Sequence, residues 1–257
     1  MGTRRDRRRD RNRRRRRRRV VVAVAAVPVL AAGVLGAEVM LAQRGERLGD
    51  APLALDGIVD GNEGGPALAV TWLGDSTAAG VGASKPGTAL PRLVAAGLDR
   101  PVDLTVLAVS GDRVGDVLDG QLPELGRVDL VLISVGANDV THLTRRSTFE
   151  RQYAGLLAGI PDGVEVVALG VPDMGAVPRF AQPLRTVAGW RGRQLATSVQ
   201  EVGEAAGARF VDIAGETGPV FRRDPGRSFA GDRYHPSDEG YRRWAEAVLA
   251  VLSDLRR

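Results

Sequence analysis

Short apolar runs alternate along this chain with segments in which apolar residues recur every three or four positions. The runs predict buried strands, and the three-to-four spacing predicts helices. The run at 129–135, Asp-Leu-Val-Leu-Ile-Ser-Val, is apolar almost throughout, which is typical of a central strand in a parallel sheet. The predicted strands are 67–73, 103–109, 129–135, 164–169 and 209–213. The predicted helices are 89–98, 113–120, 147–159, 184–206 and 237–255, with Ser147 and Ser237 as N-caps. Strands separated by helices predict a doubly wound α/β fold with a mainly parallel sheet.

The start of the chain has a different pattern, with a basic segment followed by an apolar one. Residues 1–19 contain 13 arginines and 2 aspartates, so they account for the formal net charge of +5, and the rest of the chain has an acidic balance. Residues 20–42 are apolar apart from Glu38, with Pro28 as one interruption. About 20 apolar residues span a bilayer, so we expect a membrane span at 20–42.

The arginine tail at 1–19 sets the expected orientation of this span. An arginine run is also typical of nucleic-acid-binding arms, but the adjoining apolar stretch favours a membrane, and no nucleic-acid partner is expected. Arginines before a span stay in the cytoplasm, so the C-terminal part is expected outside the cell. The stretch is longer than the roughly 7–15 residues of a signal-peptide core, and no good cleavage site follows it. We favour an uncleaved anchor in the cell membrane, with a cleaved signal and secretion as the alternative.

Residues 43–66 are rich in Gly, Asp, Glu and Pro and predict a linker. The globular domain is therefore expected at 67–257. The chain contains no cysteine, so this domain has to be stable without disulfides.

Three polar motifs follow the first three predicted strands. They are Gly74-Asp75-Ser76, Ser110-Gly111-Asp112 and Gly136-Ala137-Asn138-Asp139. Because the carboxyl ends of parallel strands meet at one edge of a sheet, we expect the three motifs to lie together there. Each motif on its own could also be an ordinary turn, because Gly, Ser, Asn and Asp are common turn residues.

A serine at such an edge can act as a nucleophile if a base and an orienting acid lie beside it. His235 can serve as the base, and Asp232, three residues earlier, can reach the same imidazole. Acyl transfer also needs donors where the oxyanion forms. The backbone N–H groups of Ser76 and Gly111 and the side-chain amide of Asn138 are the candidates. The alternatives are a solvated histidine in a helix-entry loop, a strand end at Gly111 and a turn at Asn138.

These motifs, in this order, resemble the SGNH hydrolases, also called the GDSL esterase/lipase family. The resemblance covers 67 to about 255 and implies a flavodoxin-like three-layer α/β/α sandwich with a five-stranded, mainly parallel sheet. It implies Ser76 as nucleophile, His235 as base and Asp232 as its orienting acid, with Ser76, Gly111 and Asn138 as the oxyanion hole. It also implies that no metal and no organic cofactor take part. Two positions depart from the family pattern: Thr77 replaces a leucine, and Ser110 replaces an asparagine that often precedes the glycine.

The sequence therefore predicts a serine hydrolase that cleaves carboxylic esters. Its substrate is expected to be a lipid, an acetylated polysaccharide or a cell-wall ester, and the protein is expected to be a monomer. An O-acyltransferase would use the same residues, and a catalytically silent carbohydrate-binding module could share the fold. An intact set of Ser76, Asp232 and His235 argues against the binding module, which does not need all three.

Overall fold

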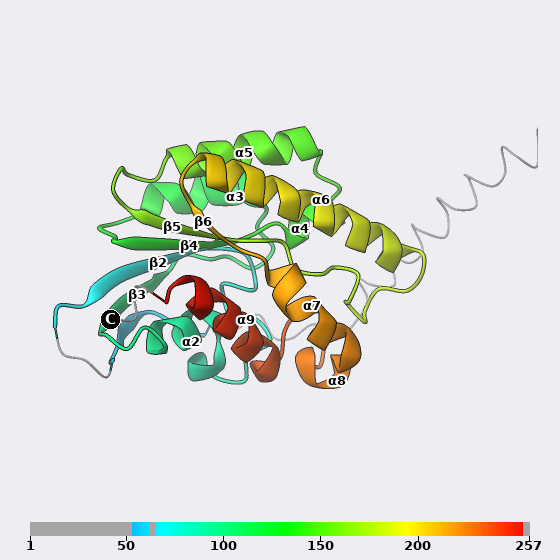
Figure 1. Ribbon diagram of the computed structural model, residues 1–257, viewed down its shortest axis with the longest axis horizontal. Coiled ribbons are helices and arrows are strands. Elements are labelled where there is room, and N and C mark those ends of the chain that lie inside the picture. The colour runs from blue at the N-terminus through cyan, green and yellow to red at the C-terminus, as the bar shows by residue number, and fades with distance from the viewer. Residues whose placement is uncertain (1–52, 62–64, 254–257) are drawn as a thin grey trace, which may run out of the picture. The chain divides into compact units, whose positions relative to one another are not determined.

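The predicted strands form most of a six-stranded sheet in the computed structural model, which describes residues 53–61 and 65–253 (Figure 1). The sheet order is β1-β3-β2-β4-β5-β6, and β2 to β6 are parallel. This order of the parallel strands is that of the flavodoxin-like fold, so the predicted fold class is confirmed. The strands are β1 (Gly57–Val59), β2 (Leu68–Gly74), β3 (Val102–Val106), β4 (Leu130–Ser134), β5 (Glu165–Leu169) and β6 (Arg209–Val211).

Strand β4 lies at the centre of the sheet, and all of its five residues are buried. Its continuous apolar run is needed because helices cover both faces of the sheet. Strand β2 is its parallel neighbour, with Gly74 opposite Ser134 at the carboxyl ends. The loops after β2, β3 and β4 therefore leave neighbouring strands at one edge, which is where the polar motifs were expected.

Helices cover the two faces of the sheet (Figure 1). Helices α3, α5 and α6 lie on one face, and α2 and α9 pack together on the other. The α-helices are α2 (Leu90–Ala96), α3 (Val114–Asp116), α4 (Ala137–Thr141), α5 (Arg146–Ala158), α6 (Leu184–Ala205), α7 (Ile213–Arg223), α8 (Pro225–Ser228) and α9 (Asp238–Val251). Three short turns of other pitch are η1 (Pro86–Thr88), η2 (Val117–Gln121) and η3 (Leu122–Glu124).

Several details differ from the sequence-based expectations. Strand β1 lies in the range expected to be a linker and pairs antiparallel with β3 at the sheet edge. Ser237 caps α9 as predicted, since its hydroxyl oxygen accepts from the N–H of Gly240 at 3.2 Å. The cap predicted at Ser147 is wrong, because α5 begins one residue earlier, at Arg146, and its first N–H groups receive no side-chain cap.

The remaining N-terminal predictions fall on residues that the structure does not describe. These are the arginine tail, the membrane span at 20–42 and most of the linker. No helix within 53–61 and 65–253 combines the length and the apolar character needed to cross a membrane.

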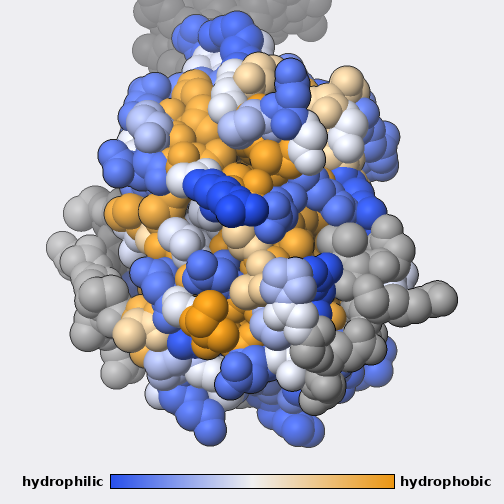
Figure 2. All heavy atoms as spheres, turned by 90° about the vertical axis from the view of Figure 1, so that its left-hand side faces the viewer, coloured by the Kyte–Doolittle hydropathy of each residue, from blue (hydrophilic) through white to orange (hydrophobic). Residues whose placement is uncertain are grey.

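The side of the molecule on which β2 begins has both hydrophilic and hydrophobic surface (Figure 2). Hydrophilic side chains there lie between separate areas of apolar surface. The three polar motifs lie at the other edge, where the strands end.

Candidate active site

Ser76 lies in a tight turn directly after β2. Gly74 ends the strand with φ +151°, and a Cβ there would lie 2.1 Å from the carbonyl oxygen of Ser134 on β4. Only glycine fits this close approach. The N–H of Asp75 then donates to the same Ser134 oxygen at 3.0 Å, so the chain turns away from the sheet immediately before Ser76.

The residues after Ser76 form consecutive turns. The N–H of Val81 donates to the Ser76 carbonyl at 2.9 Å, and the next α-helix begins only at Leu90. Gly80 and Gly82 interrupt any helix here, because both have positive φ, +76° and +100°. Gly82 also lies so close to the chain at Pro236 that a Cβ would come within 2.3 Å of that carbonyl. The turn is thereby held against the loop that carries His235.

Asp75 is buried beneath this turn. Its Oδ1 accepts from the N–H of Thr77 at 2.9 Å and from the Thr77 hydroxyl at 2.8 Å. Burial raises the pKa of Asp75 to about 6, although these hydrogen bonds and the nearby His235 act in the opposite direction. Asp75 is therefore a structural acid whose ionisation opposes folding.

The raised pKa of Asp75 predicts a pH-dependent loss of stability. A carboxyl whose folded pKa lies above its unfolded value favours the folded state below the unfolded pKa, and this contribution disappears as pH rises through about 6. Asp75→Asn keeps an oxygen acceptor for Thr77 but cannot ionise. The unfolding free energy of the wild type should therefore fall relative to that of the variant as pH rises. Between about pH 4 and pH 7 the difference should grow by about 2 to 3 kcal/mol in favour of the variant.

Urea unfolding across this pH range measures the difference. Asp119→Asn, at an exposed position, is the matched control and should follow the wild type. A difference between Asp75→Asn and the wild type that does not change with pH would contradict the prediction.

Asp232 and His235 lie in the loop between α8 and α9. The Asp232 carboxylate accepts from the backbone N–H groups of Tyr234 at 2.9 Å and His235 at 3.0 Å through Oδ1. Its Oδ2 lies 2.6 Å from His235 Nδ1. The Tyr234 ring packs edge-on against the imidazole, with 4.9 Å between ring centroids. The spacing of three residues thus allows one carboxylate to contact both the loop backbone and the ring.

His235 joins this carboxylate to Ser76. Its Nε2 lies 2.9 Å from Ser76 Oγ, across 159 residues of sequence. Burial acts to raise the pKa of Asp232, but hydrogen bonds from His235 and from the Tyr234 N–H outweigh it and hold that pKa below its usual range. An ionised carboxylate can only accept, so Nδ1 carries the proton and Nε2 can accept from the serine hydroxyl.

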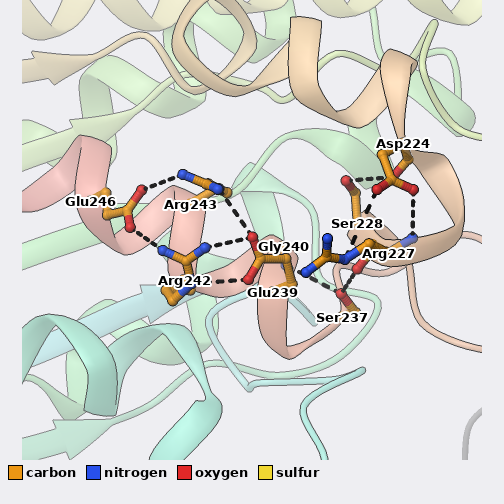
Figure 3. A network of polar contacts seen from close by, with 9 residues as sticks. All are labelled: Asp224, Arg227, Ser228, Ser237, Glu239, Gly240, Arg242, Arg243 and Glu246. Atoms are coloured by element: carbon orange, nitrogen blue, oxygen red, sulfur yellow. Dashed lines mark hydrogen bonds and ion pairs between the residues drawn. The ribbon is translucent and has the colours of Figure 1, made fainter.

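The histidine loop is fixed where it meets the helices on either side (Figure 3). At its end, the Ser237 hydroxyl caps α9 and donates to the carbonyl of Arg227, and the Ser237 N–H donates to the Ser228 carbonyl at 2.9 Å. Helix α8, which precedes the loop, is capped at its own N-terminal end by Asp224, whose carboxylate accepts from the N–H of Arg227 at 3.3 Å. These contacts limit the movement of the imidazole relative to Ser76 and favour a preorganised site.

Gly111 lies in the loop after β3, and Asn138 lies in α4, which follows β4. Gly111 has φ +97°, a conformation that favours glycine. The Asn138 side chain donates through Nδ2 to the carbonyl oxygen of Asp112 at 3.0 Å, so it links α4 to the loop after β3. The sequence had left a turn between Asn138 and Asp139 open, but the Asn138 amide bonds to the neighbouring loop.

Gln121 is a buried polar residue that the sequence analysis did not identify. Its side chain bonds to both peptide groups of Gly74 and to the Asp112 carboxylate. No motif marks it, because its partners lie 47 and 9 residues away in the sequence.

Two hollows adjoin the site. A groove of about 1170 Å³ runs along 79–84 and 108–110 to Gly231 and Arg227. A much smaller pocket of about 30 Å³ is lined by Ser76 and His235 and otherwise mainly by apolar side chains. Those side chains include Met174, Val177, Phe221, Phe229 and Trp244. Ser76 and His235 line the small pocket, whereas the groove is lined by other residues of the surrounding loops.

Comparisons with known proteins identify the family of this chain. Residues 72–243 match the GDSL-like Lipase/Acylhydrolase family. The chain is 31% identical over 224 residues to the GDSL-like esterase Rv1075c of Mycobacterium tuberculosis, a match that covers 80% of this chain and 71% of that protein.

Solved structures share the fold at lower sequence identity. Phospholipase A1 from Streptomyces albidoflavus is 21% identical with a TM-score of 0.55, over 74% of this chain and 99% of that one. The acetylxylan esterase Axe2 from Geobacillus stearothermophilus is 20% identical with a TM-score of 0.55, over 73% and 95%. With the family match over most of the described chain, these findings lead to one conclusion: this protein belongs to the GDSL-like lipase/acylhydrolase family of ester-hydrolysing enzymes.

Proposed function

We propose that Ser76, His235 and Asp232 act as the catalytic triad of a serine esterase. The observation that carries this proposal is the continuous hydrogen-bonded line from Asp232 Oδ2 through the imidazole to Ser76 Oγ, with distances of 2.6 and 2.9 Å. In this line Ser76 has an acceptor for its proton, and the acceptor has a carboxylate that stabilises the imidazolium.

The reaction follows from these contacts. Ser76 Oγ attacks the ester carbonyl carbon while its proton passes to His235 Nε2. The tetrahedral intermediate collapses, the C–O bond to the alcohol breaks, and the same proton passes to the leaving oxygen. Water then loses a proton to His235 as it attacks the acyl-enzyme, and the proton returns to Ser76 Oγ when the carboxylic acid leaves. Asp232 keeps the ring in the correct tautomer throughout.

The negative charge of each tetrahedral intermediate requires hydrogen-bond donors. We propose the N–H groups of Ser76 and Gly111 and the Asn138 amide, as the sequence predicted. Support comes from their positions after three adjacent strands and from the hydrogen bond that ties Asn138 to the residue after Gly111. One amide proton of Asn138 binds the Asp112 carbonyl, which leaves the second available for the proposed oxyanion.

The proposed substrates are esters of lipids, acetylated polysaccharides or the cell wall. Among the solved structures that share this fold, one is a phospholipase A1 and another is an acetylxylan esterase, so the fold occurs with both lipid and polysaccharide esters. We also propose that 20–42 anchors a monomeric enzyme in the membrane, with 67–257 outside the cell. The run of arginines before the apolar stretch supports this orientation.

A fluorophosphonate probe tests the proposed nucleophile. The probe phosphonylates a serine only where a base removes the hydroxyl proton, so proteolysis and mass spectrometry should locate the adduct on Ser76. Ser84 and Ser110 border the neighbouring groove and are internal controls that should stay unmodified. An adduct on another serine, or no adduct on an enzyme that cleaves esters, would contradict the assignment.

A further inference from the structure

Gln121 occupies a central position beneath the proposed oxyanion hole. It is 3% exposed and lies at the end of η2. Its Oε1 accepts from the N–H of Gly74 at 2.8 Å. Its Nε2 donates to the Gly74 carbonyl at 2.7 Å and to Asp112 Oδ2 at 2.8 Å. The acceptor and both donors of one amide are therefore engaged. We call Gln121 with its partners Gly74 and Asp112 the glutamine clamp.

The contact with Gly74 completes the pairing at the end of β2. Strand β3 ends at Val106, and the chain after it still bonds to Gly74, whose carbonyl accepts from the Val109 N–H at 3.2 Å. A buried backbone N–H without a partner is costly, and the Gln121 side chain supplies the acceptor. Because Gly74 lies two residues before Ser76, this pairing fixes the strand end from which the nucleophile turn leaves.

The contact with Asp112 extends the clamp to the other two donors. Asp112 directly follows Gly111, and its carbonyl accepts the Asn138 amide at 3.0 Å. One side chain therefore holds the loop after β2 and the loop after β3, and through Asp112 it reaches α4, which follows β4. Each of these three segments supplies one proposed oxyanion donor.

The local chain geometry is adapted to this role. Helix α3 continues into a wider π turn, η2, in which the N–H of Leu122 donates to the carbonyl of Val117, five residues earlier. π turns in helices often occur at functional sites, because they redirect a side chain. Pro123 follows directly in η3. The turn ends at Gln121 and places its amide between the two loops.

From this geometry we infer that Gln121 is a positioning residue for ester hydrolysis, aligning the N–H of Ser76, the N–H of Gly111 and the Asn138 amide as one set. The inference rests on the proposed oxyanion hole. It does not require Gln121 to touch the substrate. Misplacement of the donors by less than 1 Å weakens transition-state stabilisation while leaving ground-state binding in place.

Two substitutions test the inference. Gln121→Met keeps the length of the side chain and removes all three hydrogen bonds, so kcat should fall about 10- to 100-fold with KM nearly unchanged.

Gln121→Glu keeps the shape of the side chain, but its carboxylate faces two oxygen acceptors, Gly74 O and Asp112 Oδ2. A proton taken up at lower pH restores one donor. The ratio of kcat for Gln121→Glu to wild-type kcat should therefore rise about 3- to 10-fold between about pH 8 and pH 6. Dividing by the wild-type kcat removes the pH effects that the two proteins share.

A second substitution can rescue the first. Asp112→Asn can still accept from Gln121, so alone it should change kcat by less than about threefold. Combined with Gln121→Glu, its amide can donate to the new carboxylate, and kcat at about pH 8 should recover part of the loss. Ser198→Ala is the stability control, because Ser198 is buried between α5 and α6 and bonds to Glu150 at 2.8 Å. It should lower Tm without lowering kcat.

The outcomes separate this inference from the proposed function. If kcat in Gln121→Met equals that of the wild type while activity still depends on Ser76, the positioning role is overturned and the triad stands. If Gln121→Met does not fold, a pH-independent ratio for Gln121→Glu together with no rescue by Asp112→Asn overturns the role as well. If Ser76→Ala keeps its activity, the proposed function itself fails.

Discussion

Ser76→Ala is expected to lower kcat for ester hydrolysis by roughly 10⁴- to 10⁶-fold. The substitution removes the atom that forms the acyl-enzyme, and no other hydroxyl is hydrogen-bonded to His235 Nε2 among the interactions of the described residues. Steady-state kinetics with a chromogenic acetate ester measures the loss. Thermal unfolding provides the control, because the lost hydroxyl makes little packing contact and Tm should change by only a few degrees.

His235→Ala is expected to cost about as much as Ser76→Ala, and the double variant should be little worse than either. Residues that act as one unit show this lack of additivity, because a serine without its base is nearly inert. Asp232→Ala should cost less than either, since backbone contacts hold the loop from both helices (Figure 3). If the losses in Ser76→Ala and His235→Ala multiplied in the double variant, the two residues would act independently and the proposed triad would be wrong.

The central part of the fold could be predicted because its signals are local. The apolar run of β4 and the alternation of strands with helices need no knowledge of distant contacts. Strand β1 escaped prediction because it has only three residues, Gly57–Val59, and two of them are exposed. Helix α7 escaped because Gly215, Gly218 and Pro219 suggest a loop, yet Asp212 caps its start and tertiary packing overrides weak propensity.

The candidate site shows the same division between local and distant signals. The sequence could propose Ser76, Asp232 and His235 together, because each lies in a motif whose residue types suit one chemistry. The distances that join them depend on how the strand ends and the α8–α9 loop pack, which the sequence does not state. Gln121 shows the limit clearly. An isolated glutamine carries no motif, and its importance comes from hydrogen bonds to Gly74 and Asp112 that exist only in the folded chain.

The Asn138 amide provides the second large expected effect. Asn138→Ala should lower kcat by roughly 100- to 1,000-fold with KM little changed. In the proposed oxyanion hole, the amide donates to an oxygen that becomes negatively charged only as the tetrahedral intermediate forms, so its loss should affect turnover more than binding. The same substitution also removes the hydrogen bond to the Asp112 carbonyl at 3.0 Å, which would loosen the loop after β3.

Asn138→Asp tests whether the hydrogen-bond donor of Asn138, and not only the size of its side chain, is needed. Aspartate has nearly the same size but offers only acceptors, so it would repel both the oxyanion and the Asp112 carbonyl, and kcat should fall at least as far as in Asn138→Ala. His142→Ala, at the C-terminal end of the same helix α4, is the matched control, because the exposed His142 ring bonds to the Asn138 backbone carbonyl at 2.8 Å rather than to its side-chain amide. It should keep kcat within about threefold of the wild type. A raised KM with unchanged kcat in Asn138→Ala would make Asn138 a ground-state binding residue, and the oxyanion hole would then have to be built without it.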